Sequence, residues 1–108
     1  MLQFDEVRLE LEGLEPEIKD LAEALGLKAM ANEAAELDMK ASEPGFWDDT
    51  QRSQKILQRS SYLKNKIAAY EKLQSSYEDA LALVELANEE GDLTLLPEAQ
   101  EELEKIRS

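Results

Sequence analysis

The sequence has 108 residues, the size of one domain, and it contains neither cysteine nor histidine. These absences exclude disulfide bonds, zinc sites built from Cys and His, and catalytic triads that use either residue. The longest apolar run, Ala80 to Val84, is far shorter than a membrane span, and acidic residues crowd the first fifteen positions, unlike a secretory signal. We therefore expect a cytoplasmic protein with no membrane partner and no cofactor.

The chain is strongly acidic, with 25 Asp and Glu against 12 Lys and Arg, a net charge of −13. Because such a chain repels phosphate backbones, we expect no nucleic-acid binding by the isolated domain. Residues 1–44 carry a net charge of −8, residues 45–90 carry −2 and residues 91–108 carry −3. The first segment should therefore favour basic partner surfaces.

A first helix is predicted over residues 3–25 by an apolar stripe with alternating steps of three and four. The stripe consists of Phe4, Val7, Leu11, Leu14, Ile18, Leu21 and Leu25. Gly13 and Pro16 disturb this helix, but the stripe keeps its phase across Pro16, which predicts a kink and not a break. Gly26 is expected to end the helix.

A second helix is predicted over residues 27–41, before the turn signal Ser42-Glu43-Pro44-Gly45. Its expected apolar face, with Met30 beside it, consists of Leu27, Ala31, Ala34, Leu37 and Ala41. Alanine is the best helix former but buries little area, so this face should let a neighbouring helix approach closely.

The third predicted helix is the longest, about forty residues over 49–90, or roughly 60 Å at 1.5 Å per residue. Its heptad a positions are Ile56, Leu63, Tyr70, Tyr77 and Val84, and its d positions are Ser60, Ile67, Gln74, Leu81 and Asn88. The a positions are all apolar, so both tyrosines are expected to pack in the seam. The polar d residues are either register devices or places where the helix is left uncovered.

A last helix is predicted over residues 95–108, with Thr94 as its cap and Pro97 in its first turn. Its stripe of Leu96, Ala99, Leu103 and Ile106 is still running at Ser108, so we expect a fragment of a longer chain. The predicted fold is all-α without strands, a single domain over residues 1–108. Its expected form is an elongated, coiled-coil-like antiparallel bundle around one long central helix.

The acidic pair Asp48 and Asp49 has two readings. It could begin a metal loop, but the spacing of oxygen ligands in an EF-hand is missing, and no di-metal site of the Glu-x-x-His type exists without His. A capping box formed by Asp48 with Gln51 is the stronger interpretation. We therefore expect no metal and no catalytic residue.

Phe46 and Trp47 stand between the turn and the long helix. We expect them to form a hydrophobic staple that closes the end of the bundle, with Trp47 largely buried. The alternative is an exposed anchor for a partner protein, because Trp is enriched in interface hot spots.

The segment Pro44-Gly45-Phe46-Trp47-Asp48-Asp49, followed by Gln54-Lys55-Ile56-Leu57, resembles the N-terminal helical domain, domain one, of the bacterial peptide chain release factor 2 family. Leu63-Lys64 and Glu89-Glu90-Gly91-Asp92 fit the same pattern, and the resemblance spans essentially all 108 residues. It is closer to factor 2 than to factor 1. The sequence departs from the family in three places. Ser53 stands where the family usually has Ala, Gly13 and Pro16 lie inside the first helix, and the second helix is rich in alanine.

The resemblance implies an accessory domain and not an enzyme. The family releases the nascent peptide with a Gly-Gly-Gln loop and reads UAA and UGA with a Ser-Pro-Phe-like tripeptide, and neither occurs in these 108 residues. In the family this domain lies near the stalk base of the large ribosomal subunit and takes part in the response to the class II release-factor GTPase. The alternatives are a free-standing acidic coiled-coil adaptor or scaffold and, less favoured, an enzyme that uses acidic residues. The full-length reading frame would separate the release factor from the adaptor.

Overall fold

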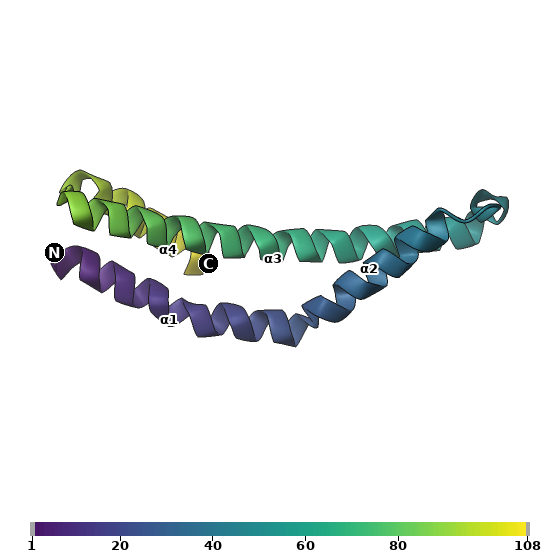
Figure 1. Ribbon diagram of the computed structural model, residues 1–108, viewed down its shortest axis with the longest axis horizontal. Helices are drawn as coiled ribbons and strands as arrows, with labels where there is room; N and C mark the ends of the chain where they lie inside the picture. The colour runs from purple at the N-terminus through teal and green to yellow at the C-terminus, as the bar shows by residue number, and fades with distance from the viewer. Residues whose placement is uncertain (1, 108) are drawn as a thin grey trace. The chain divides into compact units, whose positions relative to one another are not determined.

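A computed structural model describes residues 2–107 and contains helices only, with no strand in that range. The elements are α1 (Leu2–Leu25), α2 (Leu27–Ala41), the 3-10 turn η1 (Phe46–Asp48), α3 (Thr50–Glu90), the 3-10 turn η2 (Leu93–Leu95) and α4 (Leu96–Arg107) (Figure 1). The all-α prediction is confirmed, and the described helix ends agree with the predicted ones to within one residue. The predicted end at Ser108 lies outside the described residues. None of the described helices is both long and apolar enough to cross a bilayer.

Helix α1 continues through Pro16 without a break, as the phase of its stripe predicts, and the predicted kink at Pro16 stays a prediction. It ends at Gly26, whose φ of 65° lies in the left-handed region that favours glycine. The Gly26 N–H donates to the carbonyl of Glu23 at 3.1 Å, and the Gly26 carbonyl accepts from the N–H of Met30 at 2.9 Å. One residue therefore closes α1 and opens α2.

The start of α4 differs from the prediction in its cap. The Asp92 carboxylate accepts a hydrogen bond from the Thr94 N–H at 2.9 Å and another from the Thr94 hydroxyl. Thr94 thus lies inside the 3-10 turn, and its predicted role as the cap is wrong. Pro97 is the second residue of α4, in the first turn, where a missing N–H is tolerated.

The chain divides into two compact units. Unit 1 contains residues 1–21 and 71–108, and unit 2 contains residues 22–70. Helices α1 and α3 each contribute residues to both units. The expectation of a single domain stays a prediction.

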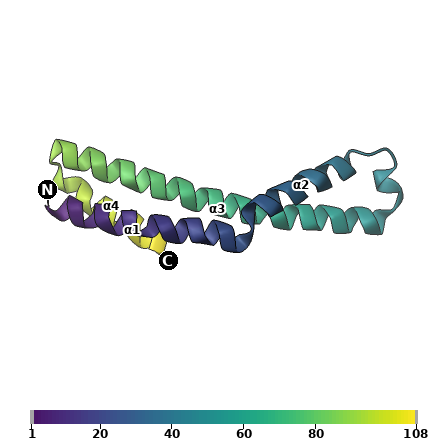
Figure 2. The same ribbon diagram turned by 60° about the horizontal axis from the view of Figure 1, so that its bottom comes forward.

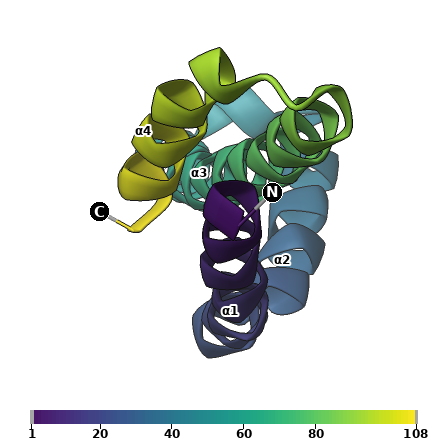
Figure 3. The same cartoon turned by 90° about the vertical axis from the view of Figure 1, so that its left-hand side faces the viewer.

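Unit 1 is built from three helices, with α1 and α4 lying along α3 (Figures 2 and 3). Its buried side chains are Phe4, Val7, Leu11 and Ile18 from α1, Tyr77, Ala80, Val84 and Ala87 from α3, and Ala99 and Leu103 from α4. The predicted stripe of α1 is confirmed, except that Leu21, its second-last member, is exposed. Three of the buried residues are alanines, whose small side chains allow close helix packing.

Unit 2 is an antiparallel hairpin of α2 and the first half of α3 (Figure 1). Its fully or nearly buried residues include Ala34, Phe46, Ser53, Ser60 and Leu63. All ten a and d positions predicted for α3, over both units, are buried or half-buried. On α2, however, Ala31 is exposed and Met30 takes its place in the half-buried face, so the predicted face was wrong at that position.

Candidate functional site

The turn between α2 and α3 carries the residues singled out by sequence. Helix α2 ends in a closed cap: the Ser42 hydroxyl donates to the Asp38 carbonyl at 3.0 Å, and the N–H groups of Ser42 and Glu43 donate to the carbonyls of Met39 and Lys40. These bonds satisfy carbonyls that the helix end would otherwise leave unpaired.

Gly45 then reverses the chain with a φ of 79°, a conformation that other residues rarely adopt. A Cβ at this position would also lie 2.9 Å from Asp48 Oδ2. The Gly45 carbonyl accepts from the Asp48 N–H at 3.0 Å and closes the 3-10 turn η1. This turn fixes the directions of the two aromatic side chains that follow Gly45.

Asp49, and not Asp48, caps α3. Its Oδ1 accepts from the Arg52 N–H at 3.1 Å, three residues ahead, which is the standard geometry of a helix N-cap. The predicted capping box of Asp48 with Gln51 is therefore wrong. The reason is the single turn of η1, which places Asp48 inside the turn and leaves Asp49 with the extended backbone that a cap requires.

Ser53 stabilises the turn through hydrogen bonds, a role that the sequence analysis did not predict. It is fully buried, and its hydroxyl lies within donating reach of two carbonyls, Phe46 O and Asp49 O, the second at 2.8 Å. An alanine would leave the Phe46 carbonyl without this donor. The hydroxyl therefore ties the aromatic turn to the first turn of α3.

The two adjacent aromatic side chains differ in solvent exposure. Phe46 is 2% exposed, whereas Trp47 is 65% exposed, and the two rings form a T-shaped pair with centroids 5.1 Å apart and planes at 82°. The predicted burial of Trp47 is wrong, because the end of a two-helix hairpin encloses one ring and Phe46 occupies that place. The exposure favours the alternative of an anchor for a partner.

Charge is segregated between the units. Unit 1 holds 18 Asp and Glu and 5 Lys and Arg, a net charge of −13, whereas unit 2 holds 7 of each and is neutral. Within α3, residues 50–70 have five basic and no acidic residues, and residues 71–90 have one basic and six acidic residues. The entire net charge of the chain thus belongs to unit 1.

The acidic surface of unit 1 includes many residues of α1. Six exposed carboxylates lie there: Glu6, Glu10, Glu12, Glu15, Glu17 and Asp20. Among the described ion pairs only Glu10 has a cationic partner in this set, Arg107 of α4, at 3.2 Å. Most of these carboxylates are therefore available to a basic partner.

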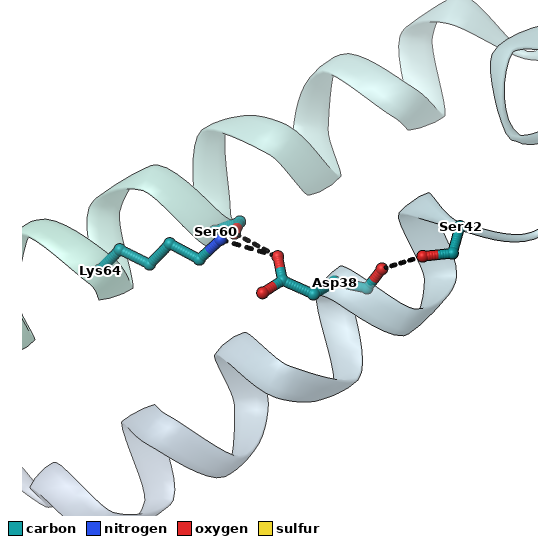
Figure 4. A network of polar contacts seen from close by, with 4 residues as sticks. All are labelled: Asp38, Ser42, Ser60 and Lys64. Atoms are coloured by element: carbon teal, nitrogen blue, oxygen red, sulfur yellow. Dashed lines mark hydrogen bonds and ion pairs between the residues drawn. The ribbon is translucent and has the colours of Figure 1, made fainter.

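In unit 2, ion pairs join α2 to α3. Arg59 donates to Glu33 through Nε at 2.6 Å and through a second guanidinium nitrogen at 3.1 Å, and the hydrogen bond from Arg59 lowers the pKa of the Glu33 carboxyl. Figure 4 shows the second contact: Asp38 Oδ1 accepts from Lys64 Nζ at 2.8 Å and from the Ser60 hydroxyl at 3.5 Å. Ser60 therefore faces α2, which supports its reading as a register device.

No group of three or more acidic residues among residues 2–107 is arranged to hold a metal ion. Sequence reasoning missed Ser53 and the basic half of α3. The net charge of −2 over residues 45–90 combines the basic first half of α3 with its acidic second half. Net charges taken separately before and after residue 70 would have revealed the basic half.

Comparison with known proteins identifies one family over most of the chain. The PCRF domain family matches residues 30–108. Peptide chain release factor 2 of Listeria innocua is 36% identical over 104 residues, 96% of this chain and 27% of that protein. The same factor from Acidothermus cellulolyticus is 33% identical over 97 residues, and that from Acholeplasma laidlawii is 39% identical over 84, covering 90% and 78% of this chain and 26% and 23% of theirs. The chain spans about a quarter of the length of these relatives.

Proposed function

Because the chain belongs to the PCRF domain family, we propose that it is the accessory N-terminal domain of a class I translation termination factor of the release factor 2 type, which responds to UAA and UGA. The observation that carries the proposal is the similarity to proteins named peptide chain release factor 2 along nearly the whole chain. The 108 residues contain no Gly-Gly-Gln and no Ser-Pro-Phe sequence. The domain by itself should therefore neither hydrolyse peptidyl-tRNA nor recognise a stop codon, and we assign it no catalytic residue and no cofactor.

In the full-length factor, we propose, the domain acts in the cytoplasm by docking near the stalk base of the large ribosomal subunit. From there it modulates the response to the class II release-factor GTPase. The acidic side of α1 is the surface proposed to meet basic protein, because complementary charge speeds encounter and orients docking.

The turn supplies a second contact in this proposal. Phe46 fills the end of the hairpin and holds Trp47 outward, so a large aromatic ring is presented on a fixed support. Exposed Trp side chains are favoured anchors in protein interfaces. Asp48 and Asp49 contribute by shaping the turn, Asp49 through the cap of α3.

The proposal is tested in the full-length factor by deleting residues 1–108 and by a finer variant, Glu6→Gln/Glu17→Gln/Asp20→Asn, on α1. Deletion should leave measurable peptide release but weaken the response to the GTPase. The triple variant should weaken the same response, and the effect should shrink as salt rises, because exposed charges are screened.

A matched control neutralises three exposed carboxylates elsewhere in unit 1, as Glu89→Gln/Glu98→Gln/Glu104→Gln. It changes the net charge equally and should leave the response nearly intact. If deletion changes neither release nor the GTPase response, the docking role is wrong. Equal losses in the two triple variants would reject α1 as the docking surface.

A further inference from the structure

One side of α3 in unit 2 carries an exposed stripe that the proposed function does not use. Its residues, spaced three and four apart along one flank of the seam, are Arg52, Lys55, Arg59, Tyr62 and Lys66. At 1.5 Å per residue, the stripe runs for about 21 Å. No acidic residue occurs anywhere in residues 50–70.

The free cations gather at the start of the stripe. Lys40, at the end of α2, lines an open groove of about 460 Å³ together with Arg52 and Lys55. No carboxylate among the described residues pairs with the side chains of these three, whereas Arg59 is neutralised by Glu33. Asp49 also lines the groove, but its Oδ1 is engaged in the cap of α3. With three cations and one carboxylate, the groove carries a net positive charge in a neutral unit.

An aromatic ring lies within the basic stripe. Tyr62 is 48% exposed, with the Arg59 guanidinium carbon 5.4 Å and Lys66 Nζ 5.8 Å from its ring centroid. Both distances are in the range of cation–π contacts, which hold the long cationic side chains along the surface. A row of cations with an interleaved aromatic is the footprint of a nucleic-acid-binding surface.

We propose that this face, formed by Lys40, Arg52, Lys55, Tyr62 and Lys66, binds the phosphate backbone of an RNA. Residues 50–70 contain no acid, and the two carboxylates that reach this flank are engaged, Asp49 by the cap of α3 and Glu33 by Arg59. A row of cations with so little free acid favours a densely charged phosphate backbone over the sparser carboxylates of an acidic protein. The net charge of −13 predicts no such binding, but that charge resides in unit 1. The inference goes beyond the proposed function and does not depend on the docking of α1.

The test uses the 108-residue chain and a fluorescein-labelled RNA hairpin with a stem of about 12 base pairs, followed by anisotropy at salt concentrations from about 50 to 200 mM. Binding should be weak, in the range of about 10⁻⁶ to 10⁻⁴ M, and should fall steeply with salt. Lys40→Gln/Arg52→Gln/Lys55→Gln should weaken it by about tenfold or more at low salt and lower the salt slope by about two to three.

The matched control is Lys19→Gln/Lys28→Gln/Lys72→Gln, three exposed lysines away from the groove. Both variants reach a net charge of −16, and circular dichroism should show unchanged helix content in both. The control should retain most of the binding. Equal losses in the two variants, or no binding by the unaltered chain at low salt, would overturn the proposal. Displacement of the RNA by poly-L-glutamate at equal charge concentration would also overturn it, in favour of an acidic protein partner.

Discussion

In unit 1 the helix α3 packs against two helices, and in unit 2 it packs against one. The difference is visible in the buried residues: unit 1 encloses Phe4, Leu11, Tyr77 and Val84 along with three alanines, whereas two of the most buried positions on α3 in unit 2 are Ser53 and Ser60. One helix thus presents a wide apolar face over its second half and a narrow, partly polar seam over its first. The number of neighbours, and not the helix itself, decides how much of it is buried.

The units also differ in charge. Unit 1 carries the whole net charge of −13, and unit 2 balances seven charges of each sign with ion pairs between its two helices. A narrow seam buries little area, so the hairpin depends more on its polar contacts and on its turn. Unit 1 gains its stability from burial, despite strong self-repulsion.

The largest contrast is expected from the same substitution at two fully buried leucines. Leu11→Ala in unit 1 should cost about 3–5 kcal/mol and Leu63→Ala in unit 2 about 2–3 kcal/mol, because two helices close over a cavity more easily than three. Urea unfolding followed by far-UV circular dichroism measures the free energy of unfolding of both variants. A larger loss for Leu63→Ala would reverse the comparison.

Two glycines should respond with opposite signs. Gly45→Ala should destabilise by about 1–2 kcal/mol, because alanine is strained at a φ of 79°. Gly13→Ala, in an open position of α1, should stabilise by about 0.5–1 kcal/mol. Thermal unfolding of both variants checks the pair, and a neutral Gly45→Ala would show that the turn has a second accessible conformation.

Tyr77 makes unit 1 sensitive to alkaline pH. Its hydroxyl is buried without a hydrogen-bond partner among the described residues, and burial, with smaller contributions from Glu15 and Glu12, raises the pKa of Tyr77. Since the unfolded pKa is about 10, stability is retained below that pH and is lost as pH rises through the folded pKa.

Tyr77→Phe should stabilise the chain by about 1 kcal/mol at neutral pH, because it removes an unsatisfied buried hydroxyl, and it should reduce the alkaline loss. Urea titrations at several pH values measure both effects. Tyr62→Phe, at an exposed ring, is the control and should change neither. If Tyr77→Phe loses as much stability at alkaline pH as the unaltered chain does, Tyr77 is not the group that causes the loss.

The smallest effect is expected at Trp47. Trp47→Ala should change the free energy of unfolding by no more than about 0.5 kcal/mol, because the ring is mostly in solvent. Phe46→Ala, one residue away, should cost several times more. The native fluorescence maximum of the unaltered chain should lie close to that of free tryptophan. A strongly blue-shifted maximum would show that Trp47 is buried, as the sequence analysis predicted.

Helix positions were predictable because their signals are local. Gly26, the Pro44-Gly45 turn and Gly91 punctuate the chain, and the three-four stripes mark the helices between them. The candidate site was predictable only as a segment. Which aromatic is buried and which aspartate caps α3 depend on the direction in which Gly45 turns the backbone, and Ser53 gains its role only when that turn folds over it.

The sequence by itself determined that residues 2–107 form four α-helices, one of them 41 residues long, and that the chain resembles the release factor family. Periodicity and turn residues act within a few positions along the chain, so they predict helices without knowledge of the tertiary contacts. Only the tertiary structure decided that α3 has two neighbours in one half and one in the other. It also decided that Trp47 faces solvent and that Lys40, from a different helix, joins Arg52 and Lys55 in one groove. Such outcomes depend on which segments meet in space. A count of charges along the chain does not show which charged side chains become neighbours.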